Sequence, residues 1–79
     1  MPVMLRYAGF KFFFYSNEGD PREPIHVHVR KGGGEAKFWI KPVSVAWSHG
    51  FDARTLRQLT EVISNNVPLL ERAWDEYFG

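Results

Sequence analysis

The chain of 79 residues contains no cysteine, so neither a disulfide nor a thiolate metal site holds its fold together. Its charges nearly cancel at a net +1, which is too small to indicate a nucleic-acid binder by bulk electrostatics. It also lacks an apolar run long enough for a signal-peptide core or a membrane span, because Arg6 and Lys11 interrupt the apolar N-terminus. We therefore expect a soluble cytoplasmic protein with no membrane partner.

Aromatic residues are abundant instead: 13 of the 79 residues are Phe, Trp or Tyr. A chain of this length is a single domain, 1–79, and a core in so small a domain is only just sufficient. Each buried aromatic side chain removes roughly 150–250 Å² from water, so a small core can still be stable. Residues 1–41 carry a net charge of +3 and residues 42–79 a net charge of −2. A difference of this size is more typical of a solvated surface than of a partner-binding polarity.

The segment 25–40, IHVHVRKGGGEAKFWI, predicts a tight β-hairpin, because two alternating runs flank three glycines. A loop of residues 32–33 and a loop of residues 31–34 give the same register. This register pairs Arg30 with Glu35, His28 with Lys37, His26 with Trp39, Val29 with Ala36, Val27 with Phe38, and Ile25 with Ile40. Since side chains alternate between faces, one face is apolar and the other carries most of the chemistry in the chain.

Further strands are predicted on both sides of this hairpin. Residues 2–7 and 10–15 read as two strands joined by a turn at 8–9, and a polar loop occupies residues 16–24. Aromatics on both faces of the 10–15 strand indicate a central strand or one with a covered outer face. Pro42 ends the strand before it. Residues 43–47 form a candidate short edge strand, and residues 48–50 a connection.

The C-terminal third has helical spacing. Asp52 is a good N-cap, and Leu56, Leu59 and Ile63 then recur at helical intervals. Pro68 interrupts, so we expect one helix to end at residue 64 or 65 and a second to begin after Asn66, with a single kinked helix as the alternative. Strands first and helices last predict an α+β fold: an antiparallel sheet of about four strands (N-terminal hairpin plus Gly-rich hairpin) covered by one or two helices.

His26 and His28 are two positions apart on one strand, so both imidazoles can converge on one ion. A metal site needs a third ligand, and the candidates, Glu35 and His49, are not fixed by spacing. We therefore predict no metal ion and no cofactor.

The same histidines suit general acid–base catalysis near neutral pH. In a metal-independent ribonuclease, His26 and His28 would transfer protons, Arg30 or Lys37 would hold the phosphate, and Trp39 and Tyr15 would stack a base. Two alternatives remain open. One is a solvent-facing sheet surface on which Arg30 and Glu35 form an ordinary cross-strand ion pair; the other is a protein-binding face. The aromatic C-terminus, WDEYF, is expected to pack on the sheet or to contact a partner.

The order MPVMLRYAGFKFFFYSNE, PIHVHV, GGGEAKFWI and AWDEYFG resembles the small bacterial domain of unknown function (DUF) 4160 family over nearly the whole chain. Members usually have two prolines before the His-x-His, where this chain has Pro24-Ile25, and Pro68 is also unusual. The resemblance implies an α+β domain without an established activity. It also implies a gene neighbour of the DUF 2442 type, in an arrangement similar to a toxin–antitoxin module.

Two functions follow as hypotheses. The first is one component of a toxin–antitoxin-like two-protein module that works by protein–protein binding, with the DUF 2442-type neighbour as partner and homodimerisation possible. The alternative is a ribonuclease acting on RNA through His26 and His28.

Overall fold

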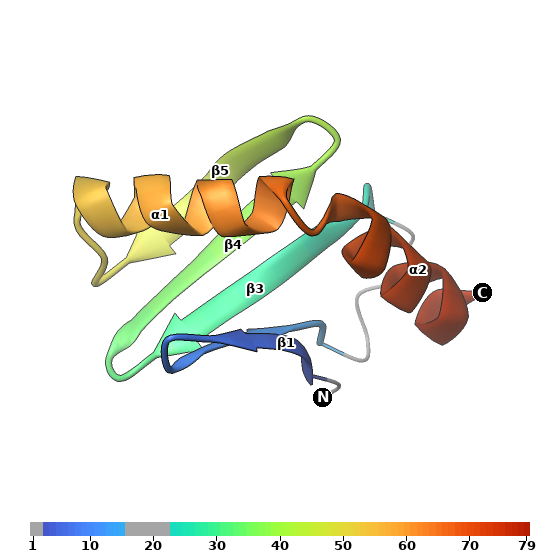
Figure 1. The fold of residues 1–79 in the computed structure, drawn as a ribbon, viewed down its shortest axis with the longest axis horizontal. Helices are drawn as coiled ribbons and strands as arrows, with labels where there is room; N and C mark the ends of the chain where they lie inside the picture. Colours follow the sequence, from blue (N-terminus) through green and yellow to red (C-terminus); the bar gives the residue numbers. More distant parts are fainter. Residues whose placement is uncertain (1–2, 16–22) are drawn as a thin grey trace.

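A computed structural model of the protein describes residues 3–15 and 23–79. The elements along the chain are β1 (Val3–Tyr7), β2 (Phe10–Phe13), β3 (His26–Lys31), β4 (Gly34–Ile40), β5 (Val43–His49), α1 (Ala53–Ser64) and α2 (Val67–Phe78) (Figure 1). The sheet order is β1-β2-β3-β4-β5, and each neighbouring pair is antiparallel. The fold is therefore an antiparallel meander followed by two helices, which confirms the predicted α+β class.

The sheet has five strands, where the sequence predicted about four. The edge strand predicted at residues 43–47 is a full strand of seven residues, because Ser48 and His49 continue to pair with Ala36 and Glu35 of β4. The prediction that 48–50 form a connection was wrong for Ser48 and His49. Strand β2 is shorter than predicted, since it ends at Phe13. Most of the polar loop predicted at 16–24 lies outside the described residues.

The β3–β4 hairpin has the predicted register in every pair. Arg30 pairs with Glu35 and His26 with Trp39, and the Ile40 N–H donates to the Ile25 carbonyl at 3.2 Å. The loop consists of Gly32 and Gly33 alone. Gly32 has a φ of 56°, a conformation that glycine adopts without strain.

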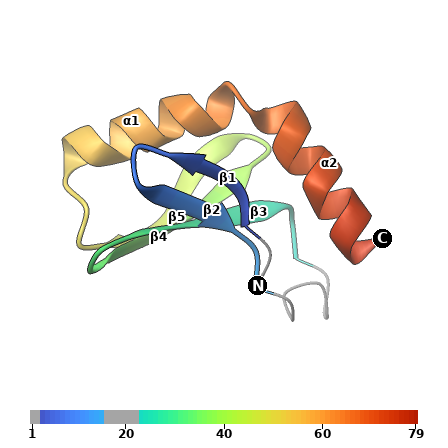
Figure 2. The same cartoon turned by 60° about the horizontal axis from the view of Figure 1, so that its bottom comes forward.

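Both helices lie on one side of the sheet, and α2 continues past its end (Figure 2). Two separate helices are present: α1 ends at Ser64, and Pro68 lies in the first turn of α2. The Thr55 N–H donates to the Asp52 carboxylate at 2.8 Å, which caps α1 and lowers the pKa of Asp52. Among the described residues, no helix is long and apolar enough to cross a membrane.

The core lies between the sheet and the helices and is almost entirely aliphatic and aromatic. Its buried members are Phe10, Phe12, Val27, Val29, Ala36, Phe38, Ile40, Leu59, Ile63 and Leu70. The apolar face of the predicted hairpin is thus the face that the helices cover.

Gly34, the first residue of β4, is buried, and there is no room for a side chain at this position. A Cβ atom at this position would lie directly against the ring of Phe51, which packs against the core and makes an edge contact with Phe10 at 5.7 Å between ring centroids. At Gly33, by contrast, a Cβ atom would have no neighbour within 4 Å.

We therefore predict that Gly34→Ala lowers the free energy of unfolding by about 1–3 kcal/mol, the range typical of overpacking. Gly33→Ala is the matched control and should change it by less than about 0.5 kcal/mol. Urea unfolding followed by circular dichroism measures both values. Equal stability of the two variants would contradict the proposed packing of Phe51 on Gly34.

Candidate functional site

The sheet face opposite the helices, here called the outer face, gathers polar and aromatic side chains in three rows across the strands. Register gives these rows as Lys11, Arg30, Glu35 and His49; Phe13, His28, Lys37 and Trp47; and His26, Trp39 and Ser44. Four strands thus bring together on one surface the residues that the sequence marked as candidates.

The middle row is covered where strands β2 and β3 meet. Phe13 is 1% exposed and His28 is 3% exposed, although α1 lies on the opposite side of the sheet. The ring of Tyr15 makes edge contacts with both, at 5.2 Å from Phe13 and 4.5 Å from His28 between centroids. Tyr15 therefore covers His28, and its base-stacking role stays a prediction.

A hydrogen-bonded cluster of Tyr15, Arg30 and Glu35 lies beside His28. Arg30 Nη2 donates to Glu35 Oε1 and to the Tyr15 hydroxyl, both at 2.9 Å, and the Tyr15 hydroxyl donates to Glu35 Oε2 at 3.0 Å. The carboxylate holds the Arg30 guanidinium in its charged form and raises its pKa. His28 Nδ1 is 3.8 Å from Glu35 Oε2. The predicted Arg30–Glu35 pair is confirmed, and it includes Tyr15 as a third member.

His26 is enclosed at the end of the sheet near α2. It has no exposed surface, and its Nδ1 lies 3.0 Å from the Pro24 carbonyl oxygen, which can only accept, so Nδ1 carries the proton. The ring lies 5.0 Å from Trp74 of α2 and 5.3 Å from His28 between centroids. The alternative of a solvent-facing sheet surface would leave both histidines exposed. That prediction was wrong, because Tyr15 covers His28 and Trp74 of α2 covers His26.

Lys37 and Trp39, the two remaining predicted binding residues, contact each other, and Lys37 also forms an ion pair with Glu23. Lys37 Nζ donates to Glu23 at 2.9 Å and lies 4.5 Å from the centre of the Trp39 ring, a cation–π contact. The carboxylate of Glu23 therefore balances the positive charge of Lys37, and the Lys37 side chain is mostly buried. Glu23, which comes from the segment before β3, was not among the predicted site residues.

Trp47 is the residue that the sequence analysis missed. It stands opposite Lys37 on β5, its ring centroid is 6.1 Å from that of His28, and it is 44% exposed. The predicted strand 43–47 already contained Trp47, but its place beside Lys37 and His28 follows only from the register of β5 against β4.

Possible metal ligands do not cluster in the described part of the structure. In the ranges 3–15 and 23–79, no group of three or more His, Cys, Asp or Glu side chains is placed to hold an ion. His49 lies opposite Glu35, while His26 is directed toward Trp74.

Chemically, the outer face offers two kinds of group. His28, Glu35, Arg30 and Tyr15 form a compact set in which proton transfer and anion binding are possible, but the imidazole is buried. Trp47 and the partly exposed Arg30 are accessible, and they are residue types that dominate protein interfaces.

The fold and the outer face define a small α+β domain with a one-sided helical layer and an open sheet surface. The family model "Domain of unknown function (DUF4160)" matches residues 9–75, so the chain belongs to this family. Comparison with curated proteins and with solved structures gave no match.

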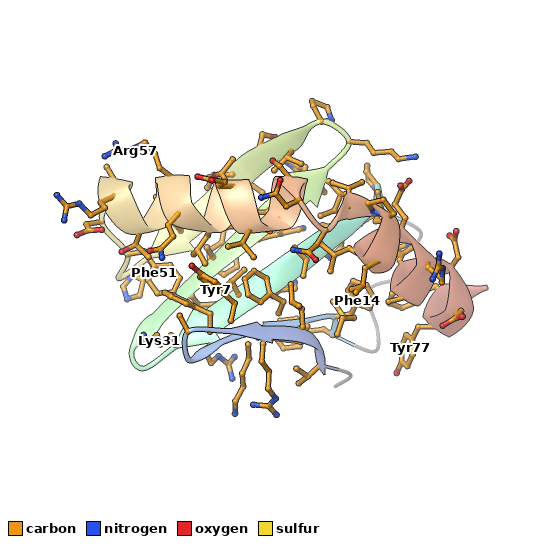
Figure 3. All side chains as sticks on the ribbon, viewed as in Figure 1. Tyr7, Phe14, Lys31, Phe51, Arg57 and Tyr77 are labelled. Atoms are coloured by element: carbon orange, nitrogen blue, oxygen red, sulfur yellow. The ribbon has the colours of Figure 1, made fainter. Side chains whose placement is uncertain are left out.

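The aromatic C-terminus divides into a buried and an exposed part. Trp74 packs against Phe14 and Phe78 at 4.9 and 4.4 Å between centroids, whereas Tyr77 is 45% exposed. Figure 3 shows Phe14 lying between the sheet and α2, and Tyr77 near the C-terminal end of α2.

Truncation of Trp74 should therefore loosen α2 from the sheet. We expect Trp74→Ala to lower the free energy of unfolding by about 3–5 kcal/mol, as for other buried aromatics. Tyr77→Ala, on the same helix, should change it by less than about 0.5 kcal/mol. Chemical denaturation of both variants is the measurement, and a small effect of Trp74→Ala would show that α2 is not held through this ring.

Proposed function

We propose that this protein is one component of a toxin–antitoxin-like two-protein module and works by binding its partner protein. The gene arrangement implied by the family resemblance supports a second small protein of the DUF 2442 type as that partner. The observation that carries the proposal is the contrast on the outer face: the two histidines are 0% and 3% exposed, while Trp47 beside them is 44% exposed. An accessible tryptophan next to a buried imidazole favours contact over catalysis.

Trp47 has the surroundings of an interface anchor. It belongs to the same row as Lys37 and His28, and the adjoining row supplies the guanidinium of Arg30. Large aromatic and Arg side chains contribute most of the binding free energy in protein interfaces, especially near the centre of the buried patch. A partner that covers this face would bury Trp47 without any rearrangement of the sheet.

The prediction is that the chain and the neighbouring DUF 2442-type protein co-purify when they are expressed together. Trp47→Ala should weaken the complex by about 30-fold or more, the size of a hot-spot substitution of about 2 kcal/mol. Tyr77→Ala is the control, since it removes an equally exposed aromatic from α2. Calorimetry on the purified pair gives both affinities.

Absence of a complex would refute the proposal. A complex that tolerates Trp47→Ala but not Tyr77→Ala would move the contact from the outer face to α2.

The second candidate, a metal-independent ribonuclease, is favoured by one observation: His28 Nδ1 is 3.8 Å from a carboxylate that also binds Arg30 and Tyr15. Such a group could exchange a proton with His28 while Arg30 neutralises a phosphate. Catalysis at this position would require the Tyr15 ring to move from His28, which it now covers.

If the protein is a ribonuclease, its expression should arrest growth, and the purified protein should cleave RNA without metal. Glu35→Gln and His28→Ala would then lower the cleavage rate by about 10²–10⁴-fold and relieve the arrest. Lys11→Gln is the control, because it removes a cation from the same face outside the Tyr15–Arg30–Glu35 cluster. Circular dichroism must show that each variant is folded. Cleavage that survives both substitutions would exclude His28 as a catalytic residue.

A further inference from the structure

Strand β5 is an edge strand without the charged residues or proline that commonly prevent pairing. It is the outermost strand of the sheet, seven residues long, and its sequence VSVAWSH contains no Lys, Arg, Asp, Glu, Pro or Gly. Natural edge strands are commonly shortened, charged or interrupted to prevent such pairing. The opposite edge, β1, is shorter and carries Arg6, and each of the two edge strands has a register shift toward its neighbour. The two edges therefore differ in their capacity to accept another strand.

The two exposed large apolar side chains of β5 lie on opposite faces. Val45 pairs with Phe38 on the helix side, whereas Trp47 pairs with Lys37 on the outer face, because a register shift lies between these pairs. Val45 is 40% exposed and Trp47 is 44% exposed. A strand added to β5 would therefore meet an exposed apolar side chain on either face, in addition to the free backbone groups of the edge.

The ends of β5 differ in charge. Near its start, Lys41 is ion-paired with Glu71 of α2. Near its end lie His49 and the first turns of α1, where Arg57 has no ion pair with any described residue. Figure 3 shows Arg57 projecting from α1 away from the β1–β2 hairpin, on the side of the sheet where β5 is outermost. Asp52, at the same end, is already used as the N-cap of α1.

We propose that β5 is the site at which the partner docks, by adding an extended segment to this edge as a sixth strand. The segment has apolar side chains that contact Val45 and Trp47, and a carboxylate side chain at the end that lies beside Arg57. The inference rests on the proposed function and specifies how the partner is bound. Backbone hydrogen bonds of the added strand supply affinity, and the two apolar contacts and the charge supply register.

Charge disfavours a second copy of this chain as the occupant. Antiparallel pairing of two β5 strands would bring the His49 end of each, with Arg57, beside the Lys41 end of the other. Parallel pairing would bring the two Arg57 residues together. Parallel pairing therefore opposes two cations, and antiparallel pairing sets Arg57 beside Lys41, whose carboxylate partner Glu71 is already used, whereas an acidic segment from another protein supplies an unpaired carboxylate at this end of the strand.

The test combines backbone hydrogen exchange with charge reversal, using the full chain and the co-purified DUF 2442-type protein. We expect amides of residues 43–49 to exchange at least about tenfold more slowly in the complex, with residues 3–7 of β1 unchanged. Arg57→Glu should weaken the complex by about 3- to 10-fold at low salt. Arg6→Glu on β1 is the matched control, with the same change in net charge, and should leave affinity unaltered.

A complex whose β5 amides gain no protection, or that gains protection at β1, would overturn the edge inference and leave the proposed function standing. Failure of the two proteins to associate would overturn both. Slow exchange of β5 in the isolated chain, lost on dilution, would identify a homodimer and refute the acidic partner segment.

Discussion

The register of the β3–β4 hairpin decides which side chains reach each face of the sheet, and the other elements pack according to that choice. Two glycines close the hairpin, so Val27 and Phe38 point to the helices while His28 and Lys37 point outward. A slip by one residue would exchange the two sets, leaving charges under α1 and apolar groups in water. Strands β2 and β5 extend the same alternation, because each pairs with one strand of this hairpin.

Burial of the histidines is a second consequence of how distant segments meet the hairpin. Tyr15, which follows β2, lies over His28, and Trp74 of α2 lies against His26. Imidazoles among aromatic rings are well accommodated when their polar atoms find partners, as His26 Nδ1 does at the Pro24 carbonyl. The two histidines of the His-x-His motif thus connect the sheet with the N-terminal hairpin and with the C-terminal helix. This structural role requires ring packing and hydrogen bonding, but no proton transfer at the imidazoles.

These contacts mark how far the sequence could predict the structure. The hairpin register, the Asp52 cap and the helix break before Pro68 follow from local rules, because each depends on residues close together in the chain. The burial of His28 could not be predicted, because Tyr15 is 13 positions away and its position depends on the β2–β3 pairing. Trp47 was missed for a related reason: its neighbours on the outer face are set by the register of β5 against β4, which shifts between Lys37 and Phe38.

The size of the domain limits how much of the sheet its helices can cover. Two helices of 12 residues each can cover one face of a five-stranded sheet, and the chain has too few residues to cover the other face and both edges as well. On the outer face, Tyr15 and Arg30 cover the region around Phe13 and His28, so exposed apolar surface remains mainly toward β5. An uncharged strand in that position would promote non-specific association unless a second protein regularly occupied it. The uncharged sequence of β5 and the exposed Trp47 are therefore the two features on which the proposal of a strand added by another chain rests.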